Sequence, residues 1–238
     1  MFGIDVSAHQ GDIDWKKVKS AGVDFAIIRA GYGTANDKNF EKNYKGAKDN
    51  NILVGAYWFC CAEDIKSANN EQYLANLILH KYEFDLPFFY DIEVPYVVNL
   101  PRDEVSTIFK TFAEPLVTKG FKIGLYSSKF YLMRCFTDDI LEKYPIWVAQ
   151  WNIDELTYEK PYLFWQYSNK GSIAGISTAV DLNTTNNIVK MDYNDVVNMV
   201  ADMVISGKFG NGEERKERLK GLYADVQSVV NNKIKEKR

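Results

Sequence analysis

Short apolar runs alternate with longer amphipathic segments along residues 1–189 of the chain. Each run is about four to eight residues long and is bounded by turn-forming or charged residues, which is typical of buried strands. The pattern predicts strands at Gly3–Ser7, Asp24–Arg29, Ile52–Phe59, Leu86–Asp91, Lys122–Ser127, Ile146–Gln150, Leu163–Tyr167 and Ala179–Leu182.

The amphipathic segments between these strands predict helices. Strands that alternate with helices indicate βα units and a mainly parallel sheet. Eight strands in this stretch, with only some connections long enough for a full helix, predict an α/β fold, an irregular TIM-like β/α barrel over residues 1–189. The predicted helices are Trp15–Ala21, Asn39–Asn50, Ile65–Tyr82, Arg102–Lys119 and Asp138–Lys143.

The pattern changes after Val189. Asp192–Ile205 carries apolar residues at helical spacing, and a glycine-rich break follows it. Two further helical stretches lie at Glu213–Leu222 and Asp225–Ile234. We therefore expect a small three-helix bundle over residues 193–233, near the lower size limit for a unit that folds alone.

Composition and charge argue against several classes of protein. Charged residues make up 26% and the net charge is -3, so the chain has no general attraction for nucleic acid or anionic membranes. No apolar run approaches the length of a membrane span. Aromatic residues make up 14%, a content that fits either stacking on sugar rings or ordinary core packing.

Cysteine and histidine are too few and too scattered for a metal centre. The cysteines are Cys60, Cys61 and Cys135, without CxxC spacing, and the histidines are His9 and His80. We therefore expect no disulfide framework, no metal site and no organic cofactor. A Cys/His peptidase using Cys60 or Cys61 is an alternative, although an inert buried thiol is the simpler interpretation.

Four carboxylates fall at or near the ends of predicted strands: Asp5, Asp91, Glu93 and Asp181. In a parallel barrel such positions share the functional mouth, and Asp91 and Glu93, two residues apart, project to the same face. A single aspartate at a strand end usually caps the following loop. Four together favour glycosidic hydrolysis, which needs a protonated carboxyl beside a negative charge.

Several motifs extend this pattern over residues 2–185. They are Gly3-Ile4-Asp5-Val6-Ser7, Val54-Gly55-Ala56-Tyr57, Asp91-Ile92-Glu93, Gly124-Leu125-Tyr126-Ser127, Trp147-Val148-Ala149, Trp165-Gln166-Tyr167-Ser168 and Val180-Asp181-Leu182-Asn183. Their order and spacing resemble family-25 glycoside hydrolases, the lysozymes that cleave peptidoglycan between N-acetylmuramic acid and N-acetylglucosamine. The chain departs from many relatives at Arg29-Ala30-Gly31-Tyr32-Gly33, which concerns the sugar subsites rather than the carboxylates.

The resemblance implies roles for the carboxylates. Glu93 becomes the general acid. Asp91 orients or electrostatically supports the reacting sugar, or assists attack by the substrate's own N-acetyl group. Asp5 and Asp181 complete the acidic floor, and Asp181 is also considered as nucleophile or base; the sequence leaves these alternatives open.

Aromatic residues end or follow the same predicted strands. We expect Tyr57, Tyr126, Trp151 and Tyr167 to stack on sugar rings or to form hydrogen bonds with them. Gln166, which lies among them, is expected to form structural hydrogen bonds.

The C-terminal segment around Gly207-Lys208-Phe209-Gly210-Asn211-Gly212 resembles the small cell-wall-binding repeat of some bacteriophage lysozymes. The resemblance implies recognition of the muropeptide, with Phe209, Asn211 and Arg215 as contacts. An arginine fork suits a carboxylate because it binds both oxygens. The alternative is that Arg215 belongs to a solvated helix face with Lys216 and Arg218.

Taken together, the resemblances imply a phage-type endolysin muramidase. Its partner would be bacterial peptidoglycan, and self-association through the C-terminal module would offset the weak binding of one repeat. The first residues run into a strand without a signal-peptide pattern, so we expect accumulation in the host cytoplasm until release to the wall.

Other interpretations stay open. Met191, at the junction, is a possible internal translation start that would release a free module, although an ordinary methionine is simpler. The chain is alternatively a hydrolase of another amino-sugar polymer such as chitin, or a non-catalytic wall-binding protein on a decayed barrel. The complete set of four carboxylates argues against decay.

Overall fold

Eight strands close into a barrel in the first unit of the structure, a computed structural model that describes residues 1–185, 193–219 and 222–236. The chain divides into two units, Met1–Asn187 and Ile188–Arg238. Met191, the residue of the internal-start hypothesis, lies outside the described residues. No helix in the described ranges is long and apolar enough to cross a membrane.

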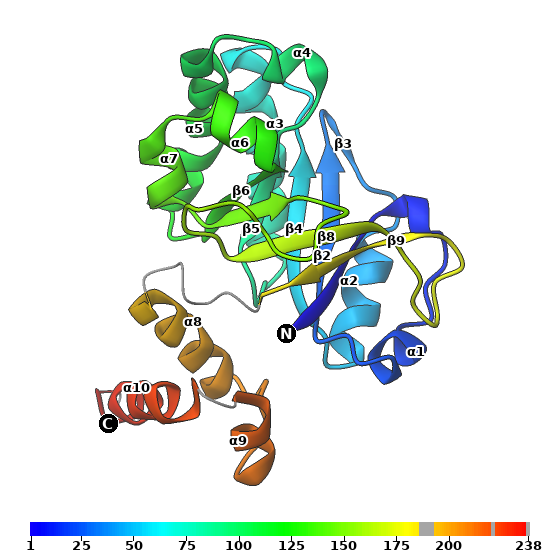
Figure 1. Ribbon diagram of the computed structural model, residues 1–238, viewed down its shortest axis with the longest axis vertical. Coiled ribbons are helices and arrows are strands. Elements are labelled where there is room, and N and C mark those ends of the chain that lie inside the picture. Colours follow the sequence, from blue (N-terminus) through cyan, green and yellow to red (C-terminus); the bar gives the residue numbers. More distant parts are fainter. Residues whose placement is uncertain (186–192, 220–221, 237–238) are drawn as a thin grey trace. The chain divides into compact units, whose positions relative to one another are not determined.

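All eight predicted strands are present, and the α/β barrel is confirmed. The barrel order is β1-β2-β4-β5-β6-β7-β8-β9 and back to β1, while β3 forms a short antiparallel addition to β2 (Figure 1). A two-residue strand carries no periodic signal, so β3 was not predicted. The strands are β1 (Phe2–Val6), β2 (Phe25–Tyr32), β3 (Ala35–Asn36), β4 (Leu53–Phe59), β5 (Phe88–Asp91), β6 (Ile123–Ser128), β7 (Ile146–Ala149), β8 (Phe164–Gly171) and β9 (Val180–Thr184).

The direction of the last strand corrects the sequence analysis. Neighbouring barrel strands are parallel from β1 through β8, but β9 runs antiparallel to both β8 and β1. Asp181 therefore lies near the beginning of its strand, not at a carboxyl end as expected. Residues 172–179, which connect β8 to β9, are too few for the helical crossover that a parallel neighbour needs.

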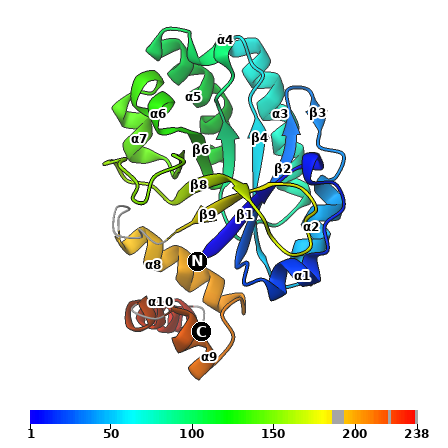
Figure 2. The same ribbon diagram turned by 45° about the vertical axis from the view of Figure 1, so that its right-hand side comes forward.

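Helices pack on the outside of the barrel along β2 to β7, whereas no described helix of this unit covers β8 and β9 (Figure 2). The five predicted helices form within one or two residues of their expected ends. The short helices α4 and α6 were not predicted. The helices of this unit are α1 (Trp15–Ser20), α2 (Phe40–Asp49), α3 (Ile65–Lys81), α4 (Pro95–Val98), α5 (Arg102–Thr118), α6 (Lys129–Cys135) and α7 (Asp138–Lys143), with a 3-10 turn at Ala8–Gln10.

Strand residues alternate between two buried layers. One layer packs against the helices, and the other fills the barrel with the rings of Phe25, Phe89 and Phe164. The centroid of the Phe164 ring lies 4.8 Å from that of Phe25 and 5.9 Å from that of Phe89. Glycines make room for these rings, since a Cβ at Gly3 or Gly124 would lie 2.3 or 2.5 Å from the ring of Phe25 or Phe89. Residues two positions further along β1 and β6 lie above this aromatic layer.

The second unit contains α8 (Tyr193–Ile205), α9 (Glu213–Leu219) and α10 (Tyr223–Glu236). Val200 and Val204 of α8 and Val226 and Val230 of α10 are buried, and Lys233 of α10 binds Asp202 of α8 at 2.7 Å. The three predicted helices are therefore present. The expected extension of the second helix to Leu222 crosses residues 220–221, which lie outside the described residues.

Candidate active site

The barrel brings all four predicted carboxylates to one mouth. Asp5 of β1 pairs in register with Asp181 of β9, and Asp91 ends β5. Glu93 follows two residues after Asp91. The negative charges of Glu93, Asp5 and Asp181 all raise the pKa of Asp91, so the four groups interact directly.

Asp5 and Asp181 form a hydrogen-bonded pair of carboxyls. Burial raises the pKa of Asp5 well above its ordinary value, and the charge of Asp181 raises it further. Their hydrogen bond raises the pKa of Asp5 and lowers that of Asp181, which places the shared proton on Asp5. Burial has the larger effect on Asp181 and leaves its pKa raised. The pair therefore holds a proton beside a negative charge.

Asp91 and Glu93 form the second half of the cluster. Burial raises the pKa of Asp91 well above its ordinary value, and the Glu93 charge adds to this, while Arg29 opposes it. Burial also raises the pKa of Glu93, with a further contribution from Asp181. The Oδ1 atom of Asp91 is buried and has no hydrogen-bond partner within the described residues, which leaves it available to a substrate group.

Gln166 of β8 connects the aromatic side chains to Asp5. Its Oε1 accepts hydrogen bonds from Tyr126 Oη at 2.9 Å and Trp151 Nε1 at 3.0 Å, and its Nε2 donates to Asp5 Oδ2 at 2.8 Å. The structural role expected for Gln166 is thus the one that the structure shows.

Asn183 is a site residue that the sequence analysis did not identify. Its Nδ2 donates to the same Asp5 oxygen at 2.8 Å, and its Oδ1 accepts from Trp147 Nε1 at 2.8 Å. The available signal was spacing: Asn183 lies two residues from Asp181 and therefore faces the same side of its strand.

Arg29 was also missed as a site residue. It pairs in register with Tyr57 on the inward face of β2, and its Nε atom binds Asp37 Oδ2 at 2.7 Å. Asp37 also accepts the backbone N–H of Ala8 at 3.0 Å. Arg29 supplies positive charge at the mouth, and it opposes the rise in pKa of both Asp91 and Tyr57.

Three of the four predicted aromatic residues border the carboxylates. Burial raises the pKa of Tyr57 and Tyr126 well above the ordinary value, and the cleft carboxylates raise both further. Trp151, 38% exposed, lies at the rim and binds Gln166. Tyr167 does not join them: its ring packs on Trp165 at 5.8 Å, and burial alone raises its pKa.

The C-terminal residues predicted to bind the wall also have contacts within the module. Phe209 is buried in the module. Arg215 donates to Gly210 O from Nε and Nη2, to Gln227 Oε1 from Nη1, and to Asn211 Oδ1 from Nη2, at 2.8–3.1 Å. Phe209 and Arg215 thus stabilise the turn that precedes α9, and their contact with the wall stays a prediction.

The structure also bears on the other chemistries. No group of three His, Cys, Asp or Glu side chains among the described residues is arranged to hold a metal ion. Cys60 is buried, and burial raises the pKa of its thiol well above the ordinary value, which makes it a poor nucleophile. The arrangement of carboxylates instead suits acid catalysis with charge stabilisation.

Comparisons with known proteins found two matching family models and several relatives. The family model described as glycosyl hydrolases family 25 matches residues 4–176, and the CW_7 repeat model matches residues 198–234. The autolytic lysozyme of Clostridium acetobutylicum is 30% identical over 76% of this chain and 55% of its own length. Lysozyme M1 of Streptomyces globisporus is 31% identical over 77% of this chain and 67% of its own length.

A solved structure shows the same likeness. The bacterial lysozyme from Streptomyces coelicolor is 29% identical, with a TM-score of 0.68 over 78% of this chain and 92% of that one. The chain spans about half the length of the Clostridium relative, so the similarity concerns the barrel rather than that whole protein.

Proposed function

Because the chain belongs to glycosyl hydrolase family 25, we propose that it is a muramidase that hydrolyses the β-1,4 bond between N-acetylmuramic acid and N-acetylglucosamine in bacterial peptidoglycan. The observation that carries the proposal is the cluster of four interacting carboxyls at the barrel mouth, in which burial raises the pKa of every member. Such a cluster supplies both a protonated acid and a stabilising negative charge.

Glu93 acts as the general acid. Burial and the charge of Asp181 raise its pKa, which favours the protonated carboxyl that can donate a proton to the leaving glycosidic oxygen. The Asp5–Asp181 pair retains negative charge on Asp181, which favours the positively charged sugar in the transition state. Asp91 Oδ1, which has no hydrogen-bond partner within the described residues, orients the reacting sugar or its N-acetyl group.

Replacing Glu93→Gln tests this assignment. The amide keeps the shape of the side chain but cannot donate a proton, so turbidity loss of Gram-positive walls should slow by ~10²-fold or more. The exposed Glu114→Gln on α5 makes the same chemical change away from the mouth and should leave the rate within about twofold. A Glu93→Gln protein that lyses walls like the wild type would contradict the proposal.

The products distinguish the substrates. A muramidase exposes reducing ends of muramic acid, whereas an enzyme for chitin releases N-acetylglucosamine ends from that polymer. If neither polymer is cut but walls are bound, the chain is a wall-binding protein rather than a hydrolase.

The C-terminal module is proposed to bind peptidoglycan, which the match to the CW_7 repeat supports. A phage-type life cycle, with accumulation in the host cytoplasm before release to the wall, and self-association through this module remain predictions. Fractionation of producing cells tests the first, and sedimentation velocity tests the second.

A further inference from the structure

A pocket of about 630 Å³ opens beside the acidic mouth, between α6 and the segment that follows β7. Its floor is formed by Ser128 and Ala149, which pair in register at the carboxyl ends of β6 and β7. Ala149 also pairs with Gln166, the residue that binds Asp5. The pocket therefore lies next to the candidate active site.

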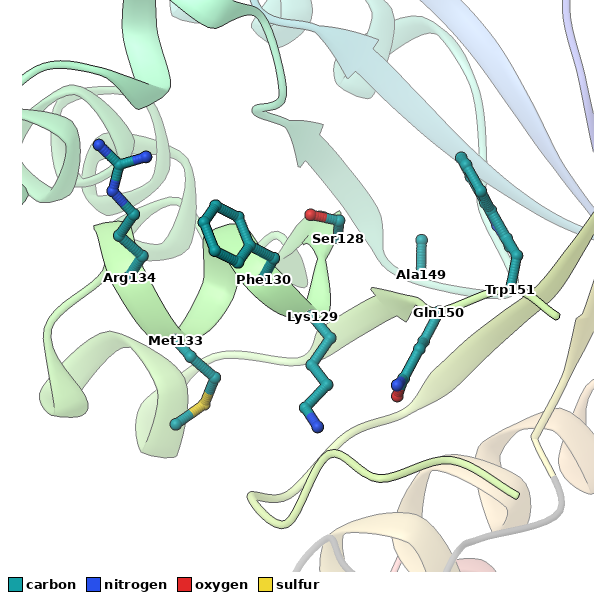
Figure 3. Close-up of a pocket in the computed structure, with 8 residues that line it drawn as sticks. All are labelled: Ser128, Lys129, Phe130, Met133, Arg134, Ala149, Gln150 and Trp151. Carbon is teal, nitrogen blue, oxygen red and sulfur yellow. The ribbon is translucent and has the colours of Figure 1, made fainter. Parts of the chain in front are cut away.

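Apolar side chains form the walls of this pocket. Phe130 is 64% exposed, Met133 47% and Trp151 38%, so three large apolar groups of one pocket face solvent. In Figure 3, Phe130 and Arg134 project from one side and Trp151 from the other, with Ser128 and Ala149 between them. An apolar surface exposed at this density indicates a binding site.

The charge of this pocket is opposite to that of the acidic mouth. The residues that line it include Lys129 and Arg134 but no carboxylate. The Arg134 guanidinium lies over the Phe130 ring at 5.8 Å and forms no ion pair within the described residues. An anionic ligand group is thus repelled by the remaining negative charge of the acidic mouth and attracted to α6.

The rim of the pocket is held in place. Lys129 Nζ donates a hydrogen bond to Thr157 Oγ1, and Gln150 Nε2 donates to the same oxygen at 2.8 Å. On the opposite wall, the hydrogen bond from Trp151 to Gln166 fixes the indole with respect to Asp5. Arg134 is the cation of the pocket that keeps its donors free for a ligand.

We propose that this pocket, called here the α6 pocket, binds the acidic peptide stem of the muramyl unit, with Arg134 pairing to a stem carboxylate. Neutral sugar rings could stack on the aromatic walls of the pocket, but they would not need the positive charges of Lys129 and Arg134. The stem is attached to the muramic acid whose bond is cut, and it carries free carboxylates, so its charge complements the pocket. The proposal rests on the muramidase function and adds to it a reason why peptide-bearing glycan is preferred.

The test compares two soluble substrates: uncrosslinked glycan strands with their stems, and the same strands after an amidase has removed the stems and left only the lactyl carboxylate of each muramic acid. For wild type, Arg134→Gln and Lys122→Gln, kcat/KM is measured on both from released reducing ends. Lys122 is an exposed cation just before the amino end of β6, whereas the α6 pocket lies at the carboxyl end of that strand. It therefore controls for the loss of one positive charge.

We expect Arg134→Gln to lower the ratio of kcat/KM for stemmed over stem-free strands by roughly tenfold, about the value of one charge-assisted hydrogen bond. Lys122→Gln should keep the wild-type ratio. Phe130→Ala, which removes one wall and the cation–π contact, should lower the ratio in the same direction.

An unchanged ratio in Arg134→Gln would overturn the stem assignment while the wild type still cuts both substrates. An equal loss on both substrates would also overturn it, because the contribution of Arg134 would then not depend on the stem. Wild-type protein that cuts neither substrate would instead refute the muramidase function itself, so the two failures are distinct.

Discussion

Buried carboxyls outside the catalytic mouth show how single residues set the pH response. Glu71 of α3 is 2% exposed, and its two oxygens accept hydrogen bonds from Tyr90 Oη and Cys61 N, each at 2.9 Å. Burial raises the pKa of Glu71 to about 7. Tyr90 precedes Asp91, and Cys61 follows β4, so Glu71 holds the edge on which the site is built.

Glu71 gives a pH-dependent contribution to stability. Its pKa is raised in the folded chain, so between about pH 4.5 and 7 the folded protein keeps a proton that the unfolded chain has lost. Stability from this group is complete below that window and is lost as the pH rises through 7.

Glu71→Gln should remove this dependence. The difference in melting temperature, wild type minus variant, should fall steadily from pH 4 to pH 8, corresponding to up to ~3 kcal/mol. Thermal melts followed by circular dichroism measure it, with exposed Glu114→Gln as the control. A difference that is constant with pH would contradict the shifted pKa.

Single site residues could be predicted from the sequence where their separation along one strand places them on the same face. Asp91 and Glu93 were predicted because two residues separate them on one strand. The amide partners of Asp5 were harder to find, since Gln166 and Asn183 meet only through the antiparallel register of β8 and β9, which includes a bulge. The internal partners of Arg215, Gly210 and Gln227, were not predicted because they are brought to it by the turn and by α10.

At the scale of elements, glycines on the inward strand faces decide how closely the rings pack. A Cβ at Gly124 of β6 would lie 2.5 Å from the Phe89 ring and 2.6 Å from Pro145 O. Phe89 in turn contacts Trp147 at 5.5 Å, and Trp147 holds Asn183. The aromatic layer thus connects strand packing to the position of Asp5.

Gly124→Ala should lower the free energy of unfolding by about 1–3 kcal/mol because the added methyl overpacks the barrel. Gly55→Ala on β4 is the matched comparison, since its Cβ would meet Leu86 Cβ at 3.0 Å and Pro87 O at 3.1 Å, and should cost less. Denaturant unfolding of both variants measures the difference. Equal losses would show that contact distance does not set the effect.

The limits of prediction for elements have a physical cause. Strand existence follows from short apolar runs, and all eight runs became barrel strands. Strand direction does not follow from such runs, so the antiparallel course of β9 was missed. Helix α6 begins directly after β6 ends and was not predicted, yet it carries half of the residues that line the α6 pocket, including both cations.

At the scale of the molecule, the chain combines a hydrolytic barrel with a helical unit that has its own core. This organisation was visible in the sequence as a change from strand-helix alternation to helices alone. The likeness to the CW_7 repeat covers only the second unit, and the likeness to family 25 only the first.

Separating the units should separate two activities. A fragment of residues 1–187 should hydrolyse soluble peptide-bearing glycan strands at nearly the rate of the full chain, but it should sediment poorly with insoluble walls. The full chain should cosediment. A fragment that cosediments as well as the full chain would place wall binding in the barrel.

The reversed last strand has a consequence for how the barrel can be combined with other sequences. Because β9 starts beside the acids and ends where Thr184 pairs with Phe2, the chain returns to the far end of the barrel, and Thr185 N bonds Met1 O at 3.3 Å. The first and last residues of the barrel thus lie together, at the end opposite the acidic mouth. A further domain joined to either end of the barrel sequence would therefore be attached away from the acidic mouth.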